Sequence, residues 1–455
     1  MKKVVIIGGG VSGMAIAYAL TRQGMTESDV AVFEKASRPG GNVQTDLVDG
    51  YTIEQGPNGF LDNVPATLSL VNDLGIDHVL PSNRNAARRF IWRDGKLREI
   101  KANPVAFLSS GVLPLSGALR VAMEPFQKRG RDDAESVFDF AARRIGKSAA
   151  EYLVAAMVQG AFAGDARRIE LKSAFPKMYA MEKQDGALVK AMMAKSRKKK
   201  QGGGPAGPGG KRTSFDEGMH TLPAALASKL GDIIKLNAGV SSLAWVGDRF
   251  VVTLENGDFA EAASVVMANP AWSAATQLDG LNAQLAHELG AITYPPVLVV
   301  ATGFNTGDLA EAPNGFGFLV PRHQGVRALG CLWSSSVWKY RAPEGRTLFR
   351  TMLGGSVDPD AAQLSDDEAI ATVLDDLKKT MGVTAVPELT RVYRYKRAIA
   401  QYEVGHSARV RRIEELFSTV PGLYLSGSSY GGISVNHCIE EAPGVAAAIL
   451  RFLRE

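Results

Sequence analysis

The chain begins with the run KKVVII at residues 2–7 and continues directly into GGGVSG at residues 8–13. A short apolar run ahead of a glycine turn predicts a buried strand of a parallel sheet. Residues 12–23 then carry the apolar spacing of a helix that Gly24 can end, and VAVFE at residues 30–34 predicts a second strand. Strand, glycine turn, helix and strand in this order begin a doubly wound α/β fold.

The glycine turn has the spacing G-x-G-x-x-G, and its residues are Gly8, Gly10, Val11, Ser12 and Gly13. Glycines at these positions let the backbone approach a pyrophosphate that lies at the N-terminus of the following helix. A purely structural glycine turn has the same pattern. Glu34, followed by Lys35, ends the second strand, where a carboxylate accepts hydrogen bonds from ribose hydroxyls. The sequence therefore predicts a bound dinucleotide.

The composition excludes several classes of protein. With 455 residues, 45% hydrophobic and 22% charged, the chain has enough apolar material for two or three interleaved globular domains. The net charge of +5 comes from one basic stretch within residues 197–212, so no basic face for nucleic acid is expected. The six histidines are scattered and predict no metal site. Two cysteines, Cys331 and Cys438, favour a reducing compartment and hence the cytoplasm.

The order of predicted elements indicates a chain that leaves the first sheet and returns to it. A hairpin is expected at residues 90–99, turned at Asp94-Gly95, and helical patterns follow it. Residues 196–212 are rich in Lys, Gly and Pro and predict a mobile loop. Residues 264–270 return to the first sheet, whereas residues 297–304, 315–320, 328–333 and 347–353 predict strands of a second sheet. No apolar run reaches the roughly 20 residues of a membrane-spanning helix.

A second motif distinguishes FAD from NAD. Arg38-Pro39-Gly40-Gly41 follows Glu34 and resembles the second fingerprint of the FAD-binding, amine-oxidase-like flavoproteins. The resemblance implies that Arg38, Gly40 and Gly41 lie near the diphosphate and ribityl chain of a noncovalently bound FAD. Asn42 departs from the family, which often has a basic residue there.

Further segments resemble, in order, motifs of the oxygen-dependent protoporphyrinogen oxidases: EQGPNGF at 54–60, Arg89-Phe90, QGAFAGD at 159–165, residues 215–223, GFGFLVP at 315–321 and MLGG at 352–355. The resemblance runs essentially from end to end. It implies FAD-dependent oxidation of protoporphyrinogen IX to protoporphyrin IX in haem synthesis. It also implies that molecular oxygen is the acceptor and that hydride passes to flavin N5 in three two-electron rounds. No catalytic side chain is expected.

The same resemblance implies a domain plan. A discontinuous Rossmann-like FAD-binding domain takes residues 1–90, 213–290 and 411–455, and a substrate-binding domain with a mixed sheet takes residues 291–410. Residues 91–212 form an inserted helical subdomain, which in the family associates with membranes. We therefore hypothesise a peripheral contact with a membrane surface, although helix faces packed inward would give the same pattern.

The resemblance also implies which residues would contact the cofactor and the substrate. The cofactor would also contact Gly56, Pro57, Asn58, Val240, Gly427, Ser434 and Val435, with Val240 at the adenine and the last three at the flavin ring. The tetrapyrrole would contact Asn58, Arg89, Gly160, Phe316, Leu319 and Met352, with Arg89 on a propionate. Ser434 and His437 depart from the family's glycine and acid. On spacing alone, Arg89 reads equally well as a surface arginine beside Arg88, and the apolar residues as inward residues of strands.

Three other functions stay open at this point. Coproporphyrinogen III carries four carboxylates and would need more basic groups around its pocket. The neutral Asn58 therefore favours protoporphyrinogen. Amine and carotenoid oxidases share the fold, but amine oxidation usually wants an aromatic cage that the C-terminal segment lacks. Rab GDP dissociation inhibitors also share it and do no redox chemistry.

Overall fold

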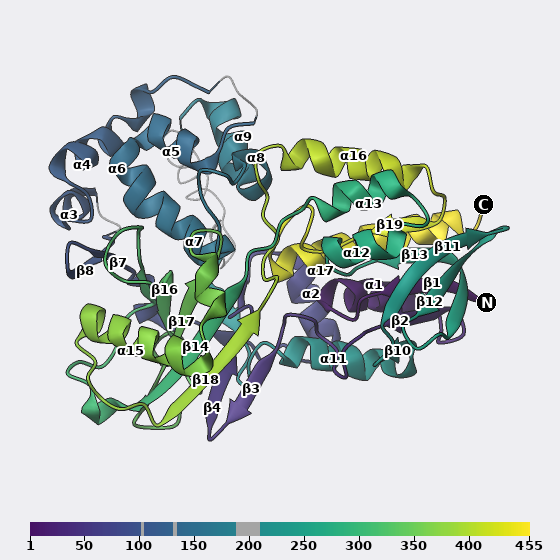
Figure 1. Cartoon of the computed structure of the whole chain (residues 1–455), viewed down its shortest axis with the longest axis horizontal. Coiled ribbons are helices and arrows are strands. Elements are labelled where there is room, and N and C mark those ends of the chain that lie inside the picture. Colours follow the sequence, from purple (N-terminus) through teal and green to yellow (C-terminus); the bar gives the residue numbers. More distant parts are fainter. Residues whose placement is uncertain (102–103, 131–133, 188–209) are drawn as a thin grey trace.

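The computed structural model describes the chain except for residues 102–103, 131–133 and 188–209. Figure 1 shows one sheet with its helices on the side of both termini, a second sheet on the opposite side, and a group of helices above that second sheet. Residues 188–209 include most of the predicted mobile loop, which therefore lies outside the described residues.

The first sheet is assembled from segments far apart in the chain. Its strands are β1 (Lys2–Ile7), β2 (Val30–Phe33), β10 (Ile234–Lys235), β11 (Val240–Val246), β12 (Arg249–Leu254), β13 (Phe259–Met267) and β19 (Leu423–Leu425). The order is β10-β2-β1-β13-β12-β11, with β19 also pairing β13. Strand β1 is parallel to both β2 and β13, and β13 is parallel to β19. The predicted returns to this sheet, and the fold class, are confirmed.

Helices cover both faces of this sheet. Successive side chains of β1 point to opposite faces, and its apolar residues 4–7 are all buried. Val4 and Ile6 pack in the core under α1 (Val11–Thr21), α2 (Pro65–Asp73), α11 (Thr221–Leu230) and α17 (Val435–Phe452). Val5 and Ile7 pack in the core with α12 (Ala271–Leu278), α13 (Ala283–Gly290) and α16 (His406–Ser418). The result is the three-layer arrangement expected of a doubly wound fold.

The second sheet has the order β18-β14-β17-β16-β15-β7-β8. Its strands are β7 (Phe90–Arg93), β8 (Lys96–Glu99), β14 (Val297–Asn305), β15 (Gly317–Leu319), β16 (Gly330–Trp333), β17 (Arg346–Gly354) and β18 (Leu389–Tyr395), with α14 (Ser334–Val337) after β16. The predicted hairpin β7-β8 is present, and it belongs to this sheet. Helix α15 (Asp366–Met381) covers one face, where Val300, Phe349 and Val373 share a core. On the opposite face, Ala301 and Leu348 share a core with Tyr51 and Ile53, and Val297 and Val299 share one with Ala163.

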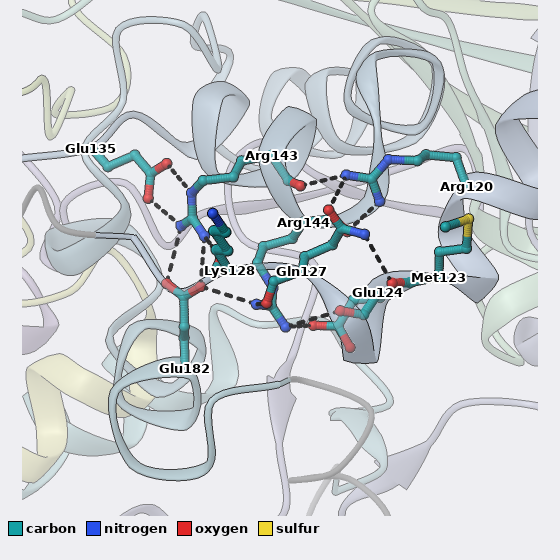
Figure 2. Close-up of polar contacts among 9 residues, drawn as sticks. All are labelled: Arg120, Met123, Glu124, Gln127, Lys128, Glu135, Arg143, Arg144 and Glu182. Atoms are coloured by element: carbon teal, nitrogen blue, oxygen red, sulfur yellow. Dashed lines mark hydrogen bonds and ion pairs between the residues drawn. The ribbon is translucent and has the colours of Figure 1, made fainter.

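The inserted helices are α3 (Pro104–Ser109), α4 (Leu115–Ala122), α5 (Val137–Ile145), α6 (Lys147–Ala149), α7 (Ala156–Phe162), α8 (Leu171–Ala174) and α9 (Pro176–Asp185). None of the helices in the described part of the chain combines the length and apolarity needed to cross a bilayer. A network of ion pairs runs through this group (Figure 2). Arg143 binds Glu135 at 2.7 Å and Glu182 at 2.8 Å. Arg144 is fully buried against Glu124 and Glu182.

Two small sheets join the large ones. Strands β3 (Thr45–Val48) and β4 (Tyr51–Glu54) form a hairpin, and β9 (Arg212–Ser214) lies between β5 (Phe60–Leu61) and β6 (Leu80–Pro81). Arg212 is opposite Leu61 in this pairing. The prediction that the basic loop extends through Arg212 is therefore wrong, because ladder hydrogen bonds hold this residue in a strand.

Candidate active site

The turn between β1 and α1 presents free backbone donors. Gly8 has a φ of +113°, which favours glycine, and Gly10 caps α1 without a side-chain hydrogen bond to the helix. Within the described residues, no acceptor is found for the N–H groups of Val11, Ser12 and Gly13. No acidic side chain lies in the first turn of the helix. Free N–H groups and a positive helix end suit a diphosphate.

The second glycine pair lies directly against this turn. The N–H of Gly40 donates to the carbonyl of Gly9 at 2.8 Å. Gly41 has a φ of +57°, and a Cβ added to it would lie 3.2 Å from the Cα of Gly10. A side chain here would close the space beside the helix N-terminus. The residues present therefore fit the diphosphate of FAD.

The adenosine end is organised around Glu34. Its Oε2 accepts from the N–H of Gly9 at 2.7 Å and its Oε1 from Ala36 at 2.8 Å, which fixes the carboxylate and leaves lone pairs for ribose hydroxyls. The N–H of Ala238 donates to the carbonyl of Glu34 at 2.8 Å, so Val240 begins its strand at this same end. Lys35 is exposed and pairs with Glu255 at 2.7 Å.

The C-terminal segment also reaches the glycine turn. A Cβ on Gly427 would lie 3.9 Å from the Oγ of Ser12. Ser434 is the N-cap of α17, with its Oγ accepting from the N–H of His437 at 3.2 Å, and Val435 begins the helix. Ser434 thus supplies a cap that the family's glycine cannot supply through a side chain. His437 lies 2.8 Å from Glu441, whose carboxylate raises the pKa of the imidazole.

Cys438, in the first turns of α17, is buried and free. Burial raises the pKa of its thiol above the usual range, so the thiolate needed for attack is disfavoured. This agrees with the expectation of a noncovalent cofactor.

Residues 55–58 form the next wall of the site. The Nη2 of Arg350, on β17, donates to the carbonyls of Gln55 and Gly56 at 3.0 Å each. Arg38 donates to the side chain of Gln55 at 3.4 Å. The Oδ1 of Asn58 is buried and has no partner among the described residues. This amide oxygen is available to a ligand, since buried polar atoms normally find a partner.

Arg350 was not anticipated from the sequence. Burial lowers the pKa of its guanidinium, and its role is to orient carbonyls rather than to meet a carboxylate. The available signal was an arginine inside the apolar strand RTLFRTMLG, because an arginine is rarely fully buried without a partner.

An apolar wall brings three of the expected substrate residues together. Leu319 is opposite Gly330 in the second sheet, and Gly330 is opposite Met352, so the side chains of Leu319 and Met352 share one face. A Cβ added to Gly160, on α7, would lie 2.5 Å from the Cδ2 of Leu319. Any larger residue at 160 would displace this wall.

Two arginines contact the ring of Phe316, another of the expected substrate residues. The guanidinium carbon of Arg89 lies 5.4 Å from the centroid of the Phe316 ring, and that of Arg212 lies 4.5 Å from it. Among the described residues, neither side chain has an ion pair or a hydrogen bond. Burial, with the nearby charge of Arg89, lowers the pKa of Arg212 to about 10. Arg88, by contrast, pairs with Glu99 at 3.1 Å.

Arg212 is the second residue that sequence reasoning missed. It was counted among the solvated charges of the basic stretch. The only local signal is its place at the end of that stretch, directly before the pattern T-S-F-D-E-G. Pairing with β5 decides its position, and that pairing joins residues far apart in the chain.

Comparison with known proteins agrees with this geometry. The profile of the family described as flavin containing amine oxidoreductase matches residues 11–450. The coproporphyrinogen III oxidase of Bacillus subtilis (strain 168) is 32% identical over 471 residues, covering 99% of this chain and 98% of that protein. The chloroplastic protoporphyrinogen oxidase of Oryza sativa subsp. japonica is 31% identical, covering 99% and 88%.

A solved structure from Exiguobacterium sp. 255-15 matches with a TM-score of 0.85 at 24% identity, covering 100% of this chain and 99% of that one. This likeness bears on the fold alone. The family assignment rests on the profile and the relatives, and it confirms the expected FAD and the expected enzyme class over the flavin-free binding protein. The chain belongs to the flavin containing amine oxidoreductase family, and it is an oxidoreductase whose cofactor is FAD.

Proposed function

We propose that this chain oxidises protoporphyrinogen IX to protoporphyrin IX with molecular oxygen as the final acceptor. FAD, when bound, supplies a hydride acceptor at N5. The observation that carries the proposal is that Arg89, at the ring of Phe316, has no ion pair or hydrogen bond among the described residues. Leu319 and Met352, which share one face of the same sheet, would form the other wall of the site. A large apolar ring with carboxylates at one edge matches both features.

In this proposal the chain's own residues bind the porphyrinogen and orient it. The guanidinium of Arg89 holds a propionate, while Leu319 and Met352 exclude water from the tetrapyrrole. The buried Oδ1 of Asn58 accepts a hydrogen bond from an N–H group of the substrate or the cofactor. Gly160 leaves room for the wall to lie flat. In this proposal no side chain acts as a general base.

The supply of cations favours a substrate with two carboxylates. Besides Arg89 and Arg212, the nearby arginines are already engaged: Arg88 by Glu99, Arg341 by Glu54, and Arg350 by backbone carbonyls. With these two cations from the part of the chain that the structure describes, four carboxylates would leave two without a partner. Coproporphyrinogen III is the second candidate, since the Bacillus relative bears the name of that oxidase.

Anaerobic mixing of the holoenzyme with each porphyrinogen tests this function. We expect protoporphyrinogen IX to bleach the visible flavin band faster than coproporphyrinogen III, and a primary amine to leave it unchanged. Faster bleaching by coproporphyrinogen would assign that substrate instead, and no bleaching by either would end the proposal. Arg89→Gln should raise KM for the porphyrinogen, whereas the matched Arg88→Gln should not.

We also propose a peripheral contact with a membrane through the inserted helices. Leu115, Leu119 and Met123 are exposed at four-residue intervals on and just after α4, and Phe126 next to them is 83% exposed. Residues so spaced share one helix face, and an exposed apolar patch marks an interaction site.

Sedimentation with vesicles of phosphatidylglycerol and phosphatidylethanolamine tests this contact. We expect the holoenzyme to sediment with the vesicles, and Leu119→Glu with Phe126→Glu to remain in the supernatant. The exposed Val386, which lies on the second-sheet side beyond α15, provides the matched control Val386→Glu. A holoenzyme that never sediments would contradict the contact.

A further inference from the structure

Arg212 is a cation that the described protein does not neutralise. It is half-buried in β9 and its guanidinium lies on the same ring as that of Arg89. The neighbouring residues 188–209 contain no acidic residue, so that segment holds no carboxylate for it. Two like charges in a partly buried site repel one another, and an anion between them removes the repulsion.

We propose that Arg212 is a specificity-determining residue that binds a second carboxylate of the substrate, beside the one held by Arg89. This inference rests on the proposed function and extends its site. Both guanidiniums contact the ring of Phe316, and the charge of Arg89 lies near enough to lower the pKa of Arg212. An arginine can hold a carboxylate through two parallel hydrogen bonds, which fixes orientation as well as charge.

The two arginines come from independent elements, which favours two carboxylates over one. Arg212 is placed by the pairing of β9 with β5, opposite Leu61, a short distance along the chain from Asn58. Arg89 precedes β7, which extends the second sheet. The N–H of Ile100 donates to the carbonyl of Arg89 at 2.8 Å and holds its backbone. The site therefore selects a substrate with two carboxylates on neighbouring edges.

Direct binding separates this role from turnover. We measure the affinity of the FAD-loaded protein for protoporphyrin IX and for its dimethyl ester, in the same detergent, by quenching of protein fluorescence. Arg212→Gln should weaken binding of the diacid about tenfold or more, the usual effect of losing a charged hydrogen bond, and should leave the diester unchanged. Arg212→Lys should recover part of the loss. Lys211→Gln, the same change of charge at an exposed neighbour, should have no effect.

Combining Arg89→Gln with Arg212→Gln decides between one and two carboxylates. Multiplying losses support separate carboxylates, whereas a double variant no weaker than either single one would overturn that arrangement. Equal losses for diacid and diester would show that Arg212 is only structural. If the protein binds the diacid through Arg212 but oxidises neither porphyrinogen, the proposed function fails and this inference stands. If it oxidises protoporphyrinogen and Arg212→Gln changes neither affinity nor KM, this inference alone fails.

Discussion

The inserted helices and the substrate side of the site each contain a pair of arginines, and the two pairs differ in their surroundings. Arg143 and Arg144 are surrounded by Glu124, Glu135 and Glu182, and every one of these charges is partnered (Figure 2). Arg89 and Arg212 share one aromatic ring and have no acid among the described residues. A charge that the protein neutralises serves the fold, whereas one left without a partner is available to a ligand.

The pKa values of Arg143 and Arg212, one from each pair, move in opposite directions. Hydrogen bonds to Glu135 raise the pKa of Arg143 above its ordinary value. Burial, together with the smaller effect of the charge of Arg89, lowers the pKa of Arg212 to about 10. At neutral pH Arg212 is still charged, so it can meet an anion.

The largest effect is expected when the partnered pair is broken. Arg144→Met leaves the buried carboxylate of Glu124 without its cation, and breaking a buried ion pair in this way costs about 3–5 kcal/mol. We expect a clear fall in the thermal unfolding midpoint. Adding Glu124→Leu to Arg144→Met should return most of the stability, because apolar pairs replace buried ion pairs well. A single variant as stable as the parent would refute the structural role of this network.

The unpartnered pair should behave in the opposite way. Arg212→Gln removes a cation that repels Arg89, so the free energy of unfolding should stay within about 1 kcal/mol of the parent, on the stabilising side. Calorimetry of the FAD-loaded protein measures this. A loss of several kcal/mol would mean that Arg212 belongs with the structural arginines and the comparison would collapse.

The pH dependence of binding sharpens the comparison further. The charge on Arg212 is present below its pKa of about 10 and is lost as the pH rises through that value. Affinity for protoporphyrin IX should therefore be constant near neutral pH and be about fourfold weaker half a unit above the pKa. The Arg212→Gln protein should show no such change over this range. A slope that persists in the variant would assign the titration to another group.

The smallest effect is expected for an exposed pair. Lys3 and Asp29 lie 2.9 Å apart where β1 and β2 begin, with the lysine side chain 61% exposed. Hydrogen bonding to the backbone of Thr26, more than Lys3, lowers the pKa of Asp29. Lys3→Gln should change the free energy of unfolding by at most about 0.5 kcal/mol. A larger change would show that burial is not what separates the Arg143–Arg144 network from other pairs.

The predicted nucleotide site rests on signals that are local in the sequence. Gly8, Gly10 and Gly13 lie on one turn, and Glu34 ends the next strand, so short-range geometry brings them together. The capping box of α15, formed by Ser365 and Glu368 three residues apart, is equally local. The wall of Leu319 and Met352 came from resemblance, and strand register places the two on one face.

Arg350 and Arg212 could not be predicted, because their roles depend on partners far away in the chain. Arg350 meets the carbonyls of Gln55 and Gly56 only after β17 and the first segment pack together. Arg212 looks like the end of a solvated basic run until β9 pairs with β5. Arg89 and Arg88 are adjacent and alike in sequence, but Arg88 pairs with Glu99 and donates to the carbonyl of Asn314.

The sequence by itself predicted FAD as the cofactor, and it predicted that the chain returns repeatedly to the first sheet. Apolar periodicity and glycine spacing act over a few residues, and they need no distant partner. Tertiary structure alone decided which arginines are neutralised and which are left for a ligand. The reason is physical: the state of a charge depends on every group around it, and folding brings those groups from separate segments.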